Sequence, residues 1–320
     1  LETMQGTMNI PTIPASSAGP DMREVTMGME GRMGIYTEVK VRVIRLAEEE
    51  KFMVCFMPSW EAGKAVAREV AQQKIPMSMM RVSNPAETRA HANLGTTLTQ
   101  FKLLDGYLRF RGLDDNRCML TFGVTGSKYQ NKTSMKQVKK ILKQHKGVGG
   151  PLANIMGSIW AHGRFKFPYL RETTWAQGIA VDTLETSTDW DNVDNLMNGM
   201  EESLRTAMKD EGEEAMVFTH LSHIYGQGSS IYTTYFFRCA DTYEGTLSRW
   251  QKLKANTCDV IAQGRATISH QHGVGRDHAP YMAAEKGVLG MRVIETLIND
   301  FDPEKRLNPG VLIEDDQQSS

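Results

Sequence analysis

Cysteine is scarce in this chain of 320 residues, and positive charge has no excess over negative charge. The cysteines form no Cys-x-x-Cys pair, which argues against a zinc ribbon or a disulfide framework; they are Cys55, Cys118, Cys239 and Cys258. A net charge of -1 provides no basic excess of the kind that nucleic-acid binding requires. No apolar run approaches the ~18 residues of a spanning helix, so no transmembrane segment is predicted, although peripheral membrane contact stays compatible with the sequence.

The remaining composition is that of an ordinary globular protein, with 40% hydrophobic and 23% charged residues. At this length about two domains are expected, and scattered cysteines favour a reducing, cytoplasmic location. After the glycine-rich segment from Gly28 to Gly34, valines alternate with basic residues. This alternation predicts a strand with Val39, Val41 and Val43 on one face.

Strands and amphipathic helices follow one another from about Glu48 to Ala262. Strands are predicted at 51–57, 77–82, 117–124, 179–186, 215–224 and 229–240, and helices at 61–74, 134–145, 190–209 and 243–262. Such units in series predict an α+β fold, with one antiparallel sheet that carries helices on one face. A further helix is expected from Ala279 to Asp300.

Two histidines in a glycine-rich segment form the first candidate site. His270 and His272 flank Gln271 and precede Gly273 and Gly275. In an extended segment alternate residues point to the same side, so both imidazoles would project toward one ligand. The glycines would let the backbone turn or approach that ligand closely. The alternative is a loop whose histidines make ordinary hydrogen bonds.

Two arginines and a tyrosine are further candidates. Arg81 lies in an apolar strand, where a charge requires either a structural acid or an anionic ligand. Arg171 ends an aromatic and basic loop and could bind a phosphate or carboxylate bidentately, or form a surface ion pair. Tyr232 lies in a strand, where tyrosines are usually core or rim residues. A nearby arginine would lower the pKa of its phenol and make it a base near neutral pH.

Metal and nucleophile sites are not predicted. His220 and His223 have no matching acidic cluster in the sequence, and Ser222 lacks the Gly-x-Ser-x-Gly turn of a hydrolase nucleophile. These residues are interpreted as structural polar side chains of a strand.

Taken in order, several motifs resemble those of the FAD-linked oxidases of the vanillyl-alcohol-oxidase class. The branch that the chain most resembles is alkyldihydroxyacetonephosphate synthase and its bacterial relatives. The matching segments are Ala18-Gly-Pro-Asp21, Gly28-Met-Glu-Gly-Arg-Met-Gly-Ile-Tyr-Thr-Glu38, Pro168-Tyr-Leu-Arg171, Asp182-Thr-Leu-Glu-Thr186 with Trp190, Ile231-Tyr232, Ser269-His-Gln-His-Gly-Val-Gly275 and Leu307-Asn-Pro-Gly310.

The resemblance implies three segments. Residues 1–46 would be the end of an FAD-binding domain whose upstream part is absent from this sequence. Residues 47–266 would be a cap domain that handles the substrate, and residues 267–320 an active-site loop, a helix and a flavin-contacting tail. The FAD would contact residues on both terminal segments, namely Glu30, Gly31, Gly34, Ile35 and Asn308. With the upstream part absent, this chain alone should bind FAD poorly.

The resemblance also implies an ether-lipid reaction without net redox change. An acyl-dihydroxyacetone phosphate would lose a proton from the carbon that bears the acyl group. That carbon would bond to flavin N5, the fatty acid would leave, and a fatty alcohol would add. Tyr232 would be the base, and Arg171 would bind substrate and lower the tyrosine's pKa. His270 and His272 would orient the phosphate, and Arg81 would lie beside the flavin. Gln271, expected to contact substrate, replaces the middle one of three histidines and cannot carry a proton or a charge.

Two alternatives remain. The first is an FAD-linked oxidoreductase of a 2-hydroxy acid such as lactate or glycolate. Such relatives hold a metal with His-x-Gly-Asp-Gly-Asn-x-His, but the segment from His223 to Tyr232 lacks the acid and the second histidine. The second is a non-catalytic cap-only subunit. The expected partners are a small lipid-phosphate or 2-hydroxy-acid substrate and a second copy in a homodimer; a eukaryotic ether-lipid enzyme would be peroxisomal.

Overall fold

The computed structural model describes residues 1–95, 98–149, 157, 161–163, 165 and 169–315. The chain forms two compact units. The central unit consists of residues 45–260, and the terminal unit combines residues 1–44 with residues 261–320. The three segments predicted from the sequence have boundaries near those of the two units, and their functional assignment stays a prediction.

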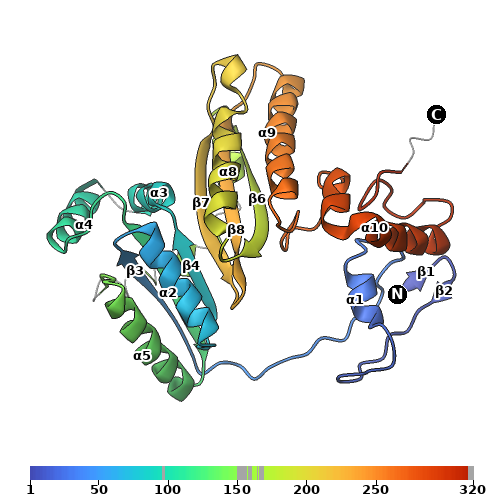
Figure 1. Ribbon diagram of the computed structural model, residues 1–320, viewed down its shortest axis with the longest axis horizontal. Helices are drawn as coiled ribbons and strands as arrows, with labels where there is room; N and C mark the ends of the chain where they lie inside the picture. The colour runs from blue at the N-terminus through green and yellow to red at the C-terminus, as the bar shows by residue number, and fades with distance from the viewer. Residues whose placement is uncertain (96–97, 150–156, 158–160, 164, 166–168, 316–320) are drawn as a thin grey trace. The chain divides into compact units, whose positions relative to one another are not determined.

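A six-stranded antiparallel sheet forms the framework of the central unit (Figure 1). Its strand order is β3-β5-β4-β7-β8-β6, and every neighbouring pair is antiparallel. This confirms the antiparallel α+β fold predicted from the alternating strands and helices. The strands are β3 (Glu49–Met57), β4 (Met79–Ser83), β5 (Cys118–Gly126), β6 (Ile179–Asp189), β7 (Met216–Ile224) and β8 (Gly228–Arg238).

The helices of the central unit follow the strands along the chain. Each of α2 and α5 begins at a serine whose hydroxyl accepts a backbone N–H of the first turn, which stabilises the start of the helix. The helices are α2 (Trp60–Gln72), α3 (Pro85–Gly95), α4 (Leu98–Phe110), α5 (Lys128–Gln144), α7 (Leu170–Trp175), α8 (Val193–Thr206) and α9 (Tyr243–Gln263). The sequence pattern predicted no element where α3 and α4 lie.

One face of the sheet is covered by helices. Gly63 of α2 lies so close to this face that a Cβ atom there would come within 2.7 Å of Val82. On β8, Ile231 and Tyr235 are fully buried, whereas Tyr232 between them is only half-buried. Successive side chains of a strand point to opposite faces, so Tyr232 lies on the face away from α2. This face is more open around β8, although α3 and α4 pack on its other half.

The sheet has one narrow joint between its halves. β4 pairs with β7 through only two register pairs, Val82 with Leu221 and Ser83 with His220. Beyond this joint the two strands diverge, and a groove of about 510 Å³ lies between the segment 74–80 and the segment 222–226. Away from this joint, α2 also contacts the other half, because Trp60 Nε1 donates to Asp194 and Gln72 Nε2 donates to the Gly226 carbonyl.

The terminal unit contains short elements around a long helix. Its elements are β1 (Glu2–Thr3), β2 (Gly6–Thr7), α1 (Met22–Met27), a 3-10 turn (Ala279–Tyr281) and α10 (Met282–Phe301). The helix predicted from Ala279 to Asp300 is confirmed. Gly287 interrupts α10 with a φ of 65°. None of the helices in the described part of the chain combines the length and the apolar character that crossing a membrane requires.

The strand predicted after Gly34 is wrong. Residues 36–47 have no regular structure, and Val41 and Val43 are 75% and 81% exposed. A strand requires a neighbouring strand for its backbone hydrogen bonds, and no described residue pairs with this segment. The alternating pattern alone therefore does not produce the strand.

Asp182 of β6 joins the sheet to α9 and provides a test of the fold. Its Oδ2 atom accepts hydrogen bonds from Tyr235 (3.0 Å), Trp250 (2.7 Å) and Lys254 (3.0 Å). Burial raises the pKa of this carboxyl, but the Lys254 charge and the donated hydrogen bonds outweigh burial and lower the pKa below its ordinary value. The ionised form therefore stabilises the fold.

We predict that Asp182→Asn lowers the free energy of unfolding by about 2 kcal/mol, because the largely buried Lys254 loses its charged partner. The stabilisation by Asp182 is complete above the carboxyl pKa of the unfolded chain and is lost as pH falls through the lower, folded pKa. Urea unfolding at pH 7 and at acidic pH measures both effects. Asp210→Asn, which breaks an exposed ion pair with Lys252, is the control and should change stability little. Equal effects of the two variants would contradict the prediction.

Candidate active site

Polar side chains form a row across the open face of the central sheet. Ser83 of β4 pairs in register with His220 of β7, which pairs with Tyr232 of β8, which pairs with Glu185 of β6. Directly paired residues of an antiparallel sheet point to the same face. The register therefore places hydroxyl, imidazole, phenol and carboxylate groups side by side on one surface.

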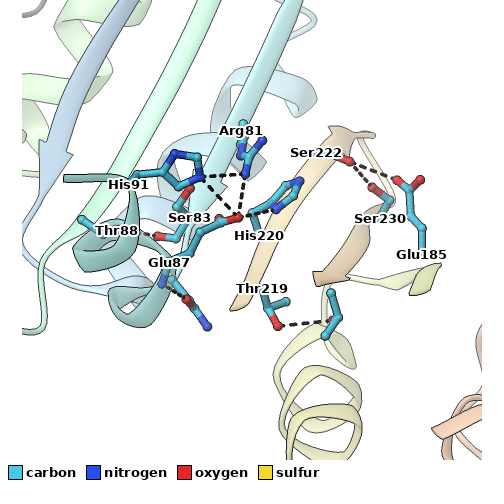
Figure 2. Close-up of polar contacts among 12 residues, drawn as sticks. Arg81, Ser83, Glu87, Thr88, His91, Glu185, Thr219, His220, Ser222 and Ser230 are labelled. Carbon is cyan, nitrogen blue, oxygen red and sulfur yellow. Dashed lines mark hydrogen bonds and ion pairs between the residues drawn. The ribbon is translucent and has the colours of Figure 1, made fainter. Parts of the chain in front are cut away.

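The Glu87 carboxylate is the centre of the most buried polar cluster on this face (Figure 2). Its Oε1 atom lies 2.6 Å from Nη2 of Arg81 and 3.0 Å from Nδ1 of His220. His91 closes the group, with its Nε2 atom 3.3 Å from Nη2 of Arg81 and 3.7 Å from Glu87 Oε1. The sequence required Arg81 to have either a structural acid or an anionic ligand, and the structural acid is present.

Asn84 fixes the position of Glu87. Its Oδ1 atom accepts the Glu87 N–H at 2.8 Å and so caps the start of α3. Its Nδ2 group donates to Oε1 of Glu201, a buried residue of α8, and its own N–H donates to the Thr219 carbonyl. Pro85 suits the first position of this helix because its fixed φ is already helical. The cap is thus tied to β7 and α8, and it holds Glu87 against Arg81.

Burial and charge together determine the ionisation of the cluster. Burial raises the pKa of Glu87, but the Arg81 cation and the hydrogen bonds to the carboxylate lower it by more than burial raises it. The net pKa therefore lies well below the ordinary carboxyl value. Burial and the Arg81 charge lower the pKa of His220, against the opposing effect of Glu87. Near neutral pH Glu87 is therefore ionised and His220 is neutral. Because a carboxylate only accepts hydrogen bonds, neutral His220 carries its proton on Nδ1 and keeps a lone pair on Nε2.

Several polar atoms of this cluster lack partners. Among the described residues, Arg81 Nε, Glu87 Oε2, Ser83 Oγ and Thr121 Oγ1 are buried and make no hydrogen bond. Arg81 and Thr121 are paired in register, so their side chains lie next to each other on the same face. Buried polar atoms are costly without partners, which makes this a place where a polar ligand group or ordered water is expected.

Tyr232 lies directly on this cluster. Its ring stacks on His220 with the centroids 4.8 Å apart and the planes 21° apart. The structure therefore brings two of the predicted site residues, Arg81 and Tyr232, to opposite sides of His220. The stacking fixes the plane of the phenol ring on the half-buried face of the sheet. The imidazole thus lies between the phenol ring and the carboxylate that binds Arg81.

A second acid–histidine pair lies at the other end of the row. Glu185 is buried, and its Oε1 atom lies 3.2 Å from Nδ1 of His223 and 3.0 Å from Oγ of Ser222. The interpretation of His220 and His223 as histidines without acidic partners is wrong, because Glu87 and Glu185 supply those partners. The prediction that no metal binds stays a prediction, since Glu185 and His223 are side chains of metal-ligating type.

Arg171 is in a different environment. It lies on the short helix α7, not in a loop, and its side chain is exposed. Part of the preceding segment, residues 164 and 166–168, is outside the described residues. The structure thus places Arg171 at the surface of the central unit, apart from the buried Glu87 cluster. Its role as a substrate clamp stays a prediction.

The histidine segment lies in the terminal unit and is not extended. Gln271 adopts a left-handed conformation with a φ of 58°, and Gly273 and Gly275 have φ values of 75° and 58°. The expected strand-like alternation of His270 and His272 is therefore wrong, because the backbone bends between the two histidines. Both residues remain at least partly accessible to solvent.

Two carboxylates hold the ends of this loop. At its start, Oε2 of Glu285 accepts the Ile268 N–H at 3.0 Å and the Thr267 hydroxyl at 2.9 Å. At its end, Glu30 accepts the N–H groups of Val274 (2.5 Å) and Gly275 (2.8 Å). Consecutive N–H groups that converge on one carboxylate form an anion-binding nest. The nest is filled by a side chain of the protein and sets the shape of the histidine loop.

Three of the predicted FAD-contacting residues also meet in the terminal unit. Asn308 donates from Nδ2 to the Glu30 carbonyl at 2.8 Å, and a Cβ atom on Gly31 would touch only Asn308, at 3.9 Å. A side chain on Gly31 would thus meet Asn308 at ordinary contact distance, and the predicted contact of these residues with FAD stays a prediction.

Gly34 and Ile35 contact Glu2 of β1. A Cβ atom on Gly34 would lie 2.3 Å from the Glu2 carbonyl oxygen, so the chain itself requires glycine at this position. Ile35 exchanges both of its backbone hydrogen bonds with Glu2. Their predicted contact with FAD stays a prediction.

Comparisons with known proteins agree along almost the whole chain. Residues 46–312 match the family described as FAD linked oxidases, C-terminal domain. The alkyldihydroxyacetonephosphate synthase of Dictyostelium discoideum is 26% identical over 318 residues, which cover 97% of this chain and 51% of the synthase. The mitochondrial D-lactate dehydrogenase (cytochrome) of Arabidopsis thaliana is 22% identical over 302 residues, which cover 93% of this chain and 48% of the dehydrogenase.

A solved structure has the same fold. That structure, an alkyldihydroxyacetonephosphate synthase, superposes with a TM-score of 0.74 at 22% sequence identity and covers 96% of this chain and 52% of its own. The chain spans about half the length of the curated relatives it matches.

We predict that Glu87→Gln lowers the free energy of unfolding by about 3 kcal/mol, because it leaves the Arg81 charge without an ionised partner in a largely buried position. The same change should free His220 from the Nδ1-protonated form. Nitrogen NMR of labelled histidine measures the tautomer, and urea unfolding measures the stability.

The control for this prediction is Glu61→Gln, which removes an acid whose side chain is 71% exposed beside Lys64. It should leave both stability and the His220 signals nearly unchanged. A wild-type His220 that titrates near its ordinary pKa of about 6.5 would contradict the assignment of a neutral imidazole.

We also predict that the two carboxylates of the histidine loop act on opposite ends of it. Glu30→Gln should speed amide hydrogen exchange at Val274 and Gly275, because an amide side chain accepts these bonds more weakly than a carboxylate. Glu285→Gln should do the same at Ile268. Each variant is the control for the other, and equal exchange changes across the whole loop in both would reject separate anchoring.

Proposed function

The chain belongs to the FAD linked oxidases through their C-terminal domain, and we propose that it handles the substrate in an FAD-dependent exchange of acyl for alkyl on a dihydroxyacetone phosphate ester. The family resemblance predicted from the ordered motifs is confirmed, and FAD is the cofactor of this family. The proposal for the reaction is supported by the similarity to alkyldihydroxyacetonephosphate synthases along nearly all of this chain.

The observation that carries the proposal is Tyr232 stacked on His220, which shares the Glu87 carboxylate with Arg81. The exchange must begin with removal of a proton from the carbon that bears the acyl group. A phenolate oxygen is a suitable base for that step when a cation stabilises it. Arg81 supplies a fixed cation in this region, and the exposed Arg171 is proposed to approach with the bound phosphate. His220 is uncharged, so it adds no second cation.

The remaining residues are proposed to orient the substrate. When bound, the flavin ring supplies the nitrogen centre at which the exchange takes place. His270, Gln271 and His272 lie on a loop that two carboxylates hold at its ends, so their hydrogen-bonding groups are positioned before substrate arrives. Imidazoles and the Gln271 amide can donate to the phosphate oxygens. Because Gln271 is neutral, phosphate binding here depends on hydrogen bonds and on arginine charge.

A second candidate is oxidation of a 2-hydroxy acid with FAD. It is favoured by the buried Glu185 next to His223, because an imidazole paired with a carboxylate can accept the proton of a hydroxyl group. The similarity to a D-lactate dehydrogenase also favours this candidate. A non-catalytic subunit is the remaining alternative, and a homodimer in the cytoplasm, or in the peroxisome of a eukaryote, remains a proposal.

The test is exchange of labelled fatty alcohol into acyl-dihydroxyacetone phosphate by full-length, flavin-loaded protein, with no electron acceptor. Tyr232→Phe should lower this exchange by about a hundredfold or more, because the substrate loses its proton acceptor. Visible absorption of bound flavin should be unchanged. This spectrum also separates a flavoenzyme from a subunit that binds no flavin.

The matched control is Tyr235→Phe on the same strand and the opposite, helix-covered face. It should retain exchange activity. Turnover of Tyr232→Phe close to wild type would remove this tyrosine as the base. Lactate-dependent reduction of the flavin, in place of exchange, would favour the oxidoreductase.

A further inference from the structure

An irregularity in β7 gathers polar side chains around one buried carboxylate. The register of β7 with β8 shifts after Leu221. Such a bulge re-aims side chains, and the next two residues, Ser222 and His223, both reach Oε1 of Glu185. Ser230 of β8 lies 2.9 Å from Ser222, hydroxyl to hydroxyl. Figure 2 shows Ser222, Ser230 and Glu185 facing one another. The bulge therefore creates a polar cluster that regular strand alternation would not form.

The acid and the histidine of this cluster have very different access to solvent. The side chain of Glu185 is 2% exposed, whereas that of His223 is 43% exposed. Because a carboxylate only accepts hydrogen bonds, the contact of 3.2 Å puts the imidazole proton on Nδ1 and the basic lone pair on Nε2. A histidine held in this way can accept a proton, and the carboxylate stabilises the cation that forms. Its exposure allows the proton to pass on to water.

The cluster lies beside the proposed base. Glu185 is the direct register partner of Tyr232, so both side chains are on the same face of the sheet. On the other side of Tyr232, His220 is a poorer proton acceptor, because burial and the Arg81 charge lower its pKa. Of the two histidines that belong to this row, His223 is therefore the better placed to take up a proton and release it.

The proposed exchange requires two proton acceptors. The bond between the ester oxygen and the substrate carbon breaks, and its electron pair leaves with the fatty acid carboxylate. The alcohol oxygen provides the electron pair of the new bond to that carbon and loses its own proton. Tyr232 already holds the proton that came from the carbon, and that proton has to return there. The proton of the alcohol must therefore go to another group, and one proton leaves the site with each carboxylate.

We infer that His223, oriented by Glu185, accepts the proton of the incoming fatty alcohol and releases it to water. The inference rests on the proposed function and assigns the second half of that reaction. The alcohol oxygen attacks the carbon from which Tyr232 removed a proton, so its O–H group enters the same row of side chains. As the O–H bond breaks, an N–H bond forms at Nε2 of His223. Glu185 is a positioning residue in this step, because it acts through the imidazole.

The experiment separates the two halves of the reaction in full-length, flavin-loaded protein. A single turnover of acyl-dihydroxyacetone phosphate without alcohol measures release of labelled fatty acid, and exchange with labelled alcohol measures the complete reaction. His223→Ala should release fatty acid at nearly the wild-type rate but lower the complete exchange about a hundredfold. Glu185→Gln should lower the complete exchange about tenfold or more. Tyr232→Phe should lose both reactions.

Chemical rescue is the second readout. Added imidazole should restore part of the exchange by His223→Ala, because the site is open to solvent and a small base can take the place of the side chain. The matched control is His145→Ala, which removes a partly exposed histidine paired with Glu69 at 3.1 Å on the helices α5 and α2. This variant should exchange at the wild-type rate and should not respond to imidazole.

Three results would overturn the inference. They are wild-type exchange by His223→Ala, an equal loss of both half-reactions in that variant, and absence of rescue by imidazole. Activity that a chelator removes and zinc restores would likewise overturn it, because the pair would then bind a metal. If the wild type itself releases no fatty acid, the proposed function fails. If wild type and His223→Ala both complete the exchange equally, only the role of His223 fails.

Discussion

The ion pair between Glu87 and Arg81 is the interaction on which the open face of the sheet depends. It places a cation at a largely buried position where it could not stay unpaired, and it sets His220 in one neutral tautomer. Tyr232 then stacks on that imidazole. One carboxylate thus determines the charge, the proton position and the packing of the residues that the proposed chemistry uses. Asn84 supports it by capping α3.

In the terminal unit, carboxylates likewise fix the position of a loop. Glu30 and Glu285 accept backbone N–H groups at the two ends of the histidine segment, which has little apolar packing of its own. A carboxylate that receives two N–H donors is a strong and directional anchor. In both units, therefore, acids that take no direct part in the proposed reaction hold the residues that do. The first expected effect of mutating these acids is a displacement of the residues that they hold.

Local pattern predicted much of the fold and only part of the site. Alternating side chains predicted the strands, and a charged residue in an apolar strand predicted a partner for Arg81. The identity of that partner depends on α3 and on the register of Ser83 with His220, which are long-range features that no local pattern encodes. The strand around Val41 and the extended form of the segment around Gln271 were both wrong. The segment around Val41 has no neighbouring strand among the described residues to accept its backbone hydrogen bonds. The loop around Gln271 is bent because acids bind the backbone N–H groups at its ends. In both cases the rest of the chain overrides the local preference.

The narrow joint between β4 and β7 has a mechanical consequence. Two register pairs are a short seam for a six-stranded sheet, and beyond it the strands separate. Glu87 bridges this seam, because it binds Arg81 from one half and His220 from the other. It shares this role with Asn84, which donates to Glu201, and with Trp60, which donates to Asp194. An anionic ligand that competed with Glu87 for Arg81 would thus weaken one of several ties between the halves of the sheet.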